Sequence, residues 1–193
     1  MHGLINRSLQ SFLRDTYGAE LWAMIADKAG VGPEGFEAML TYDDTLTDTV
    51  LAAATDNLSK PRDALLEDLG MFLVSLEPLR RLLRFGGVNY VDFLHSLDEL
   101  PDRARLAVTD IGLPELELST QGHASFTLCV GPGHSGFVPV FAGILRAMAD
   151  DYGAFALVDI ADPGGETNLI RIELLETQFA SGRAFDLARP EVA

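Results

Sequence analysis

A glycine-rich segment, residues 131–136 (GPGHSG), is where residue types and spacing come closest to a chemical motif. Glycines between a strand and a helix can cradle a phosphate on the amides of the helix start. The segment lacks the Lys-Ser/Thr of a Walker A motif, and Pro132 has no amide hydrogen to donate. His134 and Ser135 are triad residue types, but no Gly-x-Ser-x-Gly elbow holds the serine. We therefore expect a polar helix start, and we do not predict an enzyme.

Metal chemistry is not indicated either. The four histidines are dispersed, and none forms the paired spacing that a zinc site uses; they are His2, His95, His123 and His134. The single cysteine, Cys129, cannot form an internal disulfide, which agrees with a reducing compartment. The sequence thus predicts a cytoplasmic protein without a metal site built from its own side chains.

The charge balance limits the classes of partner. A formal net charge of -15 argues against nucleic acid, because phosphate binding needs clustered basic residues. The one basic cluster, Arg80, Arg81 and Arg84, is better explained as a solvated helix face than as a docking patch. No apolar run approaches the length of a membrane span, and the amino terminus lacks the continuous apolar core of a secretory signal. We expect neither nucleic acid nor a membrane as a partner.

The elements that must position these side chains change character near Pro101. Before it, apolar residues recur at helical spacing and predict a chain of helices. Ser59 is the expected N-cap of one of them, and Pro101 is expected to close the last. The predicted helices cover about residues 4–17, 20–29, 47–57, 61–73, 78–84 and 90–100.

After Pro101 the apolar period becomes two, as in half-buried strands. Strands are expected around residues 115–118 and 126–130, followed by a helix over 137–152 and a hairpin. The hairpin pairs residues 156–160 with 169–175 across the turn at 162–165. This order predicts an α+β fold with a mostly antiparallel four-stranded sheet. Residues 177–193 have weak periodicity and are predicted to be a loosely docked or disordered tail.

Several short strings occur in the same order as in a known family. They are residues 1–6 (MHGLIN), 17–22 (YGAELW), 28–30 (KAG), 93–100 (FLHSLDEL), 113–114 (LP), 136–139 (GFVP) and 143–145 (GIL). Together they make residues 1–176 resemble the haem nitric oxide/oxygen binding family, usually called H-NOX. The resemblance covers one domain.

This resemblance implies a fold, a cofactor and a role. The fold would be a helical subdomain of about residues 1–60 packed on an α/β subdomain of about residues 61–176, with haem between them. Ile5 and Pro114 match residues that line the family's pocket. The role would be a nitric oxide or oxygen sensor that regulates a signalling protein, such as a kinase or a cyclic-nucleotide enzyme. A diatomic gas would be a ligand only if haem is bound.

The same comparison shows departures at the expected haem site. Pro101 stands where the family has the histidine that binds the iron, and proline has no donor atom in its side chain. Val130, Pro132 and His134 stand where the family has the Tyr-x-Ser-x-Arg that binds the propionates. If each lost contact to a charged propionate is worth roughly 1.5–3 kcal/mol, the loss is about 3–9 kcal/mol, a hundred- to a million-fold in affinity.

Other donors are poorly directed toward the iron. His95 precedes Pro101 by six residues, which on a helix turns it about 120° away. Cys129 adjoins Val130 on a strand and should face the opposite side. Three alternatives stay open: a divergent sensor that holds haem or another flat apolar ligand, a haem-independent interaction or apolar-ligand module, and an enzyme for which no catalytic residues can be named.

Overall fold

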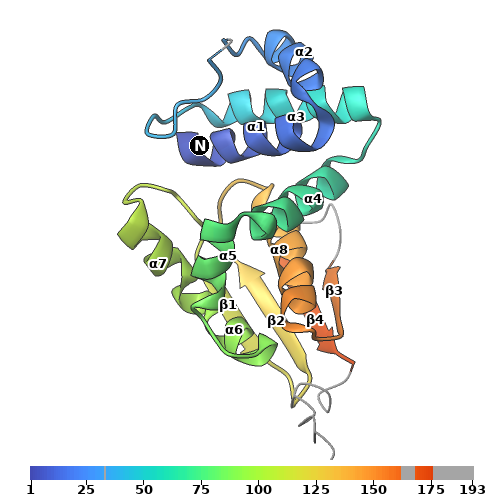
Figure 1. Ribbon diagram of the computed structural model, residues 1–193. Coiled ribbons are helices and arrows are strands. Elements are labelled where there is room, and N and C mark those ends of the chain that lie inside the picture. The colour runs from blue at the N-terminus through green and yellow to red at the C-terminus, as the bar shows by residue number, and fades with distance from the viewer. Residues whose placement is uncertain (33, 162–167, 176–193) are drawn as a thin grey trace, which may run out of the picture.

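The computed structural model describes residues 1–32, 34–161 and 168–175 (Figure 1). In this part of the chain helices dominate the first half, and the sheet belongs to the second half. The elements are α1 (Gly3–Tyr17), α2 (Ala19–Ala29), α3 (Asp44–Leu58), α4 (Arg62–Ser75), α5 (Glu77–Arg84), α6 (Tyr90–His95), a 3₁₀ turn (Leu97–Glu99), α7 (Leu100–Ala107), β1 (Leu116–Thr120), β2 (Ser125–Val130), α8 (Phe137–Tyr152), β3 (Ala156–Ile160) and β4 (Leu169–Leu174).

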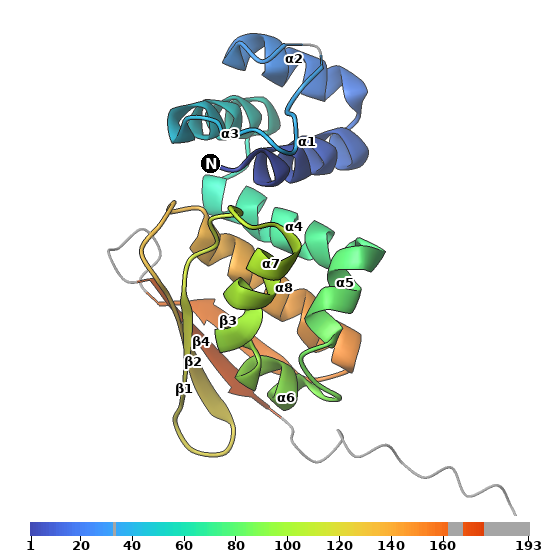
Figure 2. The same cartoon turned by 90° about the vertical axis from the view of Figure 1, so that its left-hand side faces the viewer.

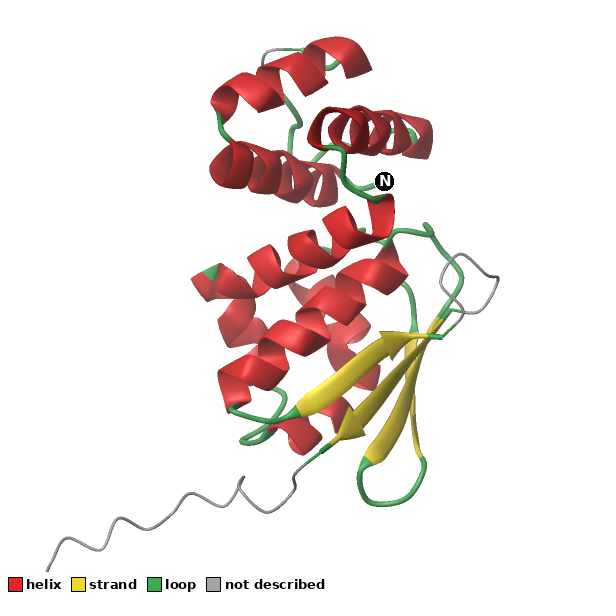
Figure 3. Cartoon of the chain, turned by 90° about the vertical axis from the view of Figure 1, so that its right-hand side faces the viewer, coloured by secondary structure: helices red, strands yellow, loops and turns green. Residues whose placement is uncertain are grey.

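The four strands form one sheet in the order β1-β2-β4-β3, and every neighbouring pair is antiparallel. Leu128 of β2 lies opposite Ile170 of β4 and, two residues along, Phe126 lies opposite Ile172. These side chains share one face, because side chains alternate along a strand. Helices α6 and α8 pack against that face, and Figure 3 shows helices on one side of the sheet. The predicted α+β class, the antiparallel sheet and the pairing of residues 156–160 with 169–175 are confirmed, while the turn at 162–165 lies outside the described residues.

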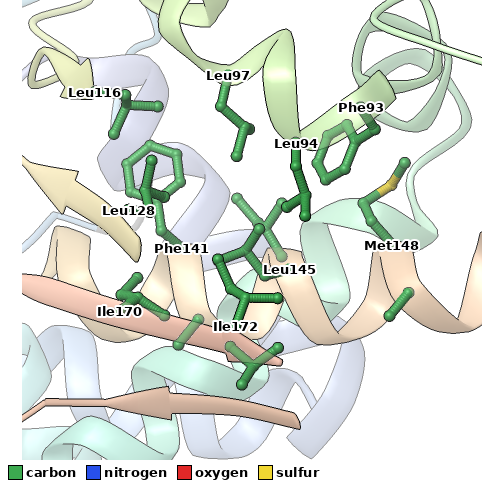
Figure 4. Close-up of a cluster of buried hydrophobic side chains, with 14 of the residues drawn as sticks. Phe93, Leu94, Leu97, Leu116, Leu128, Phe141, Leu145, Met148, Ile170 and Ile172 are labelled. Atoms are coloured by element: carbon green, nitrogen blue, oxygen red, sulfur yellow. The ribbon is translucent and has the colours of Figure 1, made fainter. Parts of the chain in front are cut away.

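Two hydrophobic clusters hold the layers together. One joins α1, α2 and α3 to the first half of α4. The other fills the space between α8, α6 and the sheet, where Leu145 and Met148 are fully buried (Figure 4). Helix α4 runs between α1–α3 on one side and α8 with the sheet on the other (Figure 2). The predicted division near residue 60 stays a prediction, and the predicted tail lies outside the described residues.

Helices α4 and α8 approach each other closely because each has a glycine at the contact. A Cβ on Gly70 would lie 2.1 Å from the carbonyl oxygen of Val140. A Cβ on Gly143 would lie 2.0 Å from the carbonyl oxygen of Glu67. Only glycine allows two helix backbones to pass at this separation. The crossing therefore sets the distance between the two helices that flank the cavity described below.

The prediction that Pro101 closes a helix is wrong. Helix α6 ends at His95, a 3₁₀ turn follows, and α7 begins at Leu100 with Pro101 in its first turn. Proline fits there because the first amides of a helix have no carbonyl acceptor within the helix. Residue 101 therefore begins a helix instead of ending one.

Two other boundaries differ from the predictions. Helix α3 begins at Asp44 instead of near Thr47, because the side chain of Asp43 accepts a hydrogen bond from the amide of Thr45. The prediction that Ser59 caps α4 is wrong. It ends α3 in the left-handed conformation, with φ of 51°, and α4 follows Pro61 without a side-chain cap. Among the described helices, none has the length and apolar character needed to cross a bilayer.

Candidate functional site

A cavity of about 360 Å³ lies where α1 and α3 meet α4, α5, α7 and α8. Its volume is near the lower end of the roughly 300–1,000 Å³ range of small-molecule sites. Leucine is the commonest residue of its walls, and the other apolar side chains come from α1, α7, α8 and the segment after α7. They include Leu4, Ile5, Leu9, Leu51, Leu66, Leu69, Leu73, Leu79, Leu82, Leu83, Leu100, Ala104, Ala107, Val108, Ile111, Leu113, Phe137, Val140, Phe141 and Ile144.

The apolar lining determines what the cavity can hold. Burial of apolar surface is worth about 25 cal/mol per Å², so a flat or compact hydrocarbon body would bind favourably. Most of the lining residues sit on long helices whose backbone groups are already paired, so the walls offer few polar contacts. Specificity must therefore come from the few polar side chains at the wall.

Four polar side chains reach this wall, and three of them already have partners. The hydroxyl of Ser8 donates to the carbonyl of Leu4 at 2.9 Å, within its own helix. The hydroxyl of Thr47 donates to Oδ1 of Asn6 at 2.8 Å, which joins α3 to α1. The ring of His134 is hydrogen-bonded to Asp48 and to the amide of Gly136. Among the described residues, Nδ2 of Asn6 has no hydrogen-bond partner, although the side chain has no exposed surface.

An unpaired buried amide is costly. Leaving a buried donor unsatisfied costs about 1–3 kcal/mol, whereas an apolar residue of similar size would carry no such cost. Asn6 lies on the same stripe of α1 as Leu9 and Leu13, both of which are buried. A polar residue within an apolar stripe is the signal in the sequence that could have identified this position, and our sequence analysis missed it.

His134 is bound on both of its ring nitrogens. Its Nδ1 accepts a hydrogen bond from the amide of Gly136 at 3.1 Å, so the proton of the neutral ring lies on Nε2. Nε2 donates to Oδ1 of Asp48, 3.0 Å away on α3. The same oxygen accepts from the guanidinium of Arg62 at 2.6 Å. These three residues connect the loop before α8 to α3 and α4 beside the cavity.

The pKa of Asp48 is lowered by this arrangement. Partial burial acts to raise the pKa, but the hydrogen bond and charge of Arg62, together with His134, outweigh burial. A carboxylate with a lowered pKa contributes stability above its ordinary pKa of 3.8, and that contribution is lost as the pH falls through the lower folded value.

We expect Asp48→Asn to lower the free energy of unfolding at about pH 7 by at most about 1 kcal/mol, because the ion pair between Asp48 and Arg62 is partly exposed to solvent. The difference from the parent should shrink as the pH falls below 3.8. Urea unfolding at a series of pH values measures it. A difference that stays constant down to the acid limit would show that the charge of Asp48 does not act in this way.

The predicted site residues are placed in different surroundings. Ile5 and His134 line the cavity. Pro101 is buried on α7, one turn before the lining residue Ala104, but is not itself among the described lining residues. Three others lie beside the loop after β2: Pro114 is buried near Gly133, Val130 is buried at the end of β2, and Pro132 is exposed. Only part of the predicted set is therefore brought together at one cavity.

The remaining candidate donors for a metal are directed elsewhere. His2 caps α1 by accepting from the amide of Leu4 at 3.2 Å. His95 is exposed, with its ring against Phe126, and His123 is exposed. Cys129 is half buried and alternates with the buried residues of β2, as predicted for the opposite face of the strand. Within the described part of the chain, no three His, Cys, Asp or Glu side chains are grouped so that they could hold a metal ion.

Comparison with known proteins places the whole arrangement in one family. The family model "Haem-NO-binding" matches residues 2–158. The chain is 22% identical to soluble guanylate cyclase gcy-31 of Caenorhabditis elegans over 174 residues, which is 88% of this chain and 25% of that protein. It is 21% identical to soluble guanylate cyclase 89Db of Drosophila melanogaster over 155 residues, 79% of this chain and 23% of that protein. The chain thus spans about a quarter of the length of these relatives.

Solved structures share the fold. A mutant of the H-NOX protein of T. Tengcongensis superimposes with a TM-score of 0.76 at 16% identity, covering 91% of this chain and 98% of that one. An H-NOX mutant of K. algicida superimposes with a TM-score of 0.74 at 18% identity, covering 92% and 98%. The chain therefore belongs to the Haem-NO-binding family, whose domain is a sensory one, found in soluble guanylate cyclases and in H-NOX proteins.

Proposed function

We propose that this chain is the sensory domain of a signalling system, and that occupancy of the cavity is its signal. The observation that carries this proposal is the position of the cavity, which is bounded by α1 and α3 on one side and by α4, α7 and α8 on the other. A ligand in the cavity contacts both of these groups of helices. It therefore favours the relative placement of the two groups that gives it the better contacts.

The output of the domain is proposed to act on a partner. The relatives are named soluble guanylate cyclases, and a cyclic-nucleotide enzyme or a kinase, acting in the cytoplasm, is the kind of partner that a domain of this family would regulate. The domain itself is not proposed to catalyse a reaction. Ser135 and His134 do not form a nucleophile and base, because both ring nitrogens of His134 are bound to other groups.

Haem held through an axial histidine does not fit these residues. Haem iron in proteins is bound by histidine, cysteine, tyrosine or, beside a histidine, methionine. Among the described residues, the side chains of these types at the cavity are His134 and Met1. His134 has no free nitrogen, and the thioether of Met1 would have no histidine beside it. Pro101 offers no donor.

The propionates of haem would also lack hydrogen-bond donors at the positions where the family binds them. Val130 is buried in the core of the sheet and Pro132 faces solvent. His134 holds the carboxylate of Asp48, and a second carboxylate at this place would be repelled by the first. We therefore propose a ligand that binds by burial in the apolar cavity. A haem-based gas sensor is the second candidate, favoured by the family match and by the apolar walls.

Binding of 1-aminoanthracene, an apolar fluorescent probe, tests the proposal. We expect the parent to bind it, and Ala104→Phe to weaken binding roughly tenfold or more, because the larger side chain fills the cavity and about 1.4 kcal/mol of burial corresponds to tenfold. Leu106→Phe is the matched control, since residue 106 lies on the same helix and is 90% exposed.

The same experiment has a readout for signalling. Occupancy should slow amide hydrogen exchange in both α1 and α7, because the ligand contacts both layers. Equal binding to parent and Ala104→Phe, or protection confined to one layer, would contradict the proposal.

A further inference from the structure

We propose that the outer side of α5, with the turn that follows it, is a docking surface for an acidic and partly apolar segment of the signalling partner. This α5 surface consists of Arg80, Arg81, Arg84, Phe85 and Val88. The inference rests on the proposed function, because it assigns the surface through which occupancy of the cavity would reach the partner. It is carried by the two faces of α5, one at the cavity and one at the surface.

Helix α5 is polar on one side and apolar on the other. Its three leucines line the cavity: Leu79, Leu82 and Leu83. Successive residues of a helix turn by about 100°, so the three arginines lie on the opposite side. Figure 2 shows α5 at the edge of the molecule, beside the end of α8. A molecule in the cavity therefore contacts the same helix that presents the arginines to solvent.

Two of the arginines bind α5 to the end of α8. Nη2 of Arg80 lies 2.5 Å from Oδ1 of Asp151, and Nη1 of Arg84 lies 2.7 Å from its Oδ2. The guanidinium of Arg84 also lies over the ring of Tyr152, 4.5 Å from the ring centroid. The solvated helix face predicted for this cluster therefore applies only to Arg81.

The third arginine stands near exposed apolar side chains. The side chain of Arg81 is 78% exposed and pairs with Glu77 one turn earlier. Phe85 and Val88, four and seven residues further on, are 83% and 88% exposed. Phe85 lines an open hollow together with Glu77 and the arginines. Arginine beside an aromatic side chain is typical of protein interfaces, whereas a single exposed residue such as Leu106 is ordinary.

Charge determines the chemistry of the partner segment. The three arginines outnumber the two carboxylates bound to them, Glu77 and Asp151, on a chain whose net charge is -15. An acidic side chain of the partner can pair with Arg81 while an apolar one covers Phe85 and Val88. Charges are screened beyond about 8 Å at physiological salt, so a short segment interacts mainly with the arginines. An anionic membrane would extend over the rest of this acidic chain and be repelled.

Selection from a random dodecapeptide library displayed on phage tests the α5 surface. Peptides that are enriched on the parent and lost on Arg81→Gln combined with Phe85→Ser should have a net negative charge and carry an apolar residue. Synthetic copies should bind this variant roughly tenfold or more weakly than the parent, because arginine and aromatic side chains dominate binding at interfaces. Fluorescence polarisation measures the dissociation constants.

A matched variant controls for the loss of any exposed arginine and apolar side chain. Arg105→Gln combined with Leu106→Ser removes an arginine that pairs with a carboxylate, beside an apolar residue that is 90% exposed. The peptides should bind this control as they bind the parent. All four positions are exposed, so both variants should stay near the stability of the parent.

Saturation of the cavity with 1-aminoanthracene tests the link between cavity and surface. It should change the affinity for a selected peptide about fivefold or more, which is the usual size of coupling between two sites. The coupling is reciprocal, so the peptide should change the affinity for the probe by the same factor. Arg81→Gln combined with Phe85→Ser should bind the probe as the parent does, because neither residue is among the described residues that line the cavity.

The outcomes separate this inference from the function on which it rests. The inference would be overturned if no peptide depended on the α5 surface, or if the dependent peptides were neutral or basic. It would also be overturned if the surface served a parent dimer in sedimentation or bound phosphatidylserine vesicles, with either interaction lost in the variant. Peptide affinity that cavity occupancy leaves unchanged would contradict the inference but not the sensory cavity. Failure of 1-aminoanthracene to bind would overturn the proposed function, while acidic peptides lost only in the variant would still support the docking surface.

Discussion

Pro101→His combined with His134→Arg is expected to raise the affinity of this domain for haem by roughly 10²- to 10⁴-fold. Two contacts would be restored, an axial bond to iron and an ion pair to a propionate. If each is worth roughly 1.5–3 kcal/mol, the sum of about 3–6 kcal/mol corresponds to that range. It would be the largest functional effect of any change considered for this chain.

The structure gives the reason for choosing these two positions. Residue 101 lies one turn before Ala104 along α7, and the side chain of Ala104 lines the cavity. A histidine there would be on the correct side of the helix. Residue 134 already lines the cavity, and Asp48 keeps Arg62 as a partner when the histidine is replaced. Val130→Tyr is omitted because Val130 is only 2% exposed within the core.

Absorption spectra during haemin titration measure this effect. The double variant should show a Soret band of a histidine-ligated iron and saturate at stoichiometric haemin, whereas the parent should show only weakly bound pigment. Leu106→His is the control, because it adds a histidine to the same helix on a side that is 90% exposed. Equal pigment in parent and double variant, or a firmly coordinated iron in the parent, would mean that another donor in this chain binds haem.

Gly143→Ala is expected to lower the free energy of unfolding by about 2–4 kcal/mol. Overpacking a well-packed contact costs about 1–3 kcal/mol and occasionally more. Here the new Cβ would meet the backbone of Glu67, with the carbonyl oxygen at 2.0 Å and the carbonyl carbon at 2.8 Å. A backbone cannot rotate away as a side chain can, so α4 and α8 must separate. The better helix propensity of alanine, about 1 kcal/mol, offsets only part of this.

Chemical denaturation measures the loss of stability, and a melting temperature lower by roughly 5–12 °C should accompany it. Gly32→Ala is the matched control, because Gly32 is exposed and a Cβ there meets no atom within 4 Å. The control should stay within about 0.5 kcal/mol of the parent. If Gly143→Ala did the same, the close crossing of α4 and α8 would not determine the stability of this layer.

Much of the fold could be predicted from local patterns. The alternation of Phe126, Leu128 and Val130 predicted β2, and the apolar period of residues 137–152 predicted α8, because both patterns depend on which face of one element is buried. The errors came at boundaries. Pro101 and Ser59 are residue types that can stand either at the start or at the end of a helix. The neighbouring residues in the chain do not show which of the two applies.

The site was predicted less completely than the fold. The sequence showed that residues 101, 130 and 132 have no donor for iron or propionate, since that follows from side-chain chemistry alone. It also placed Ile5 and His134 in the expected set, both of which line the cavity. It did not reveal Asn6, Thr47 or Asp48, because their role depends on hydrogen bonds to residues far away in the chain.

Side-chain chemistry alone excludes a donor for iron or propionate at residues 101, 130 and 132, because a valine or a proline has none in any fold. Which polar groups meet depends on how the helices pack: Thr47 bonds to Asn6 across 41 residues of the chain, and His134 bonds to Asp48 across 86. Such pairs form when helices pack, and packing is set by the sum of many apolar contacts along the whole chain. A pattern within one helix can show that Asn6 is out of place, but only the packed helices show that its amide is left without a partner.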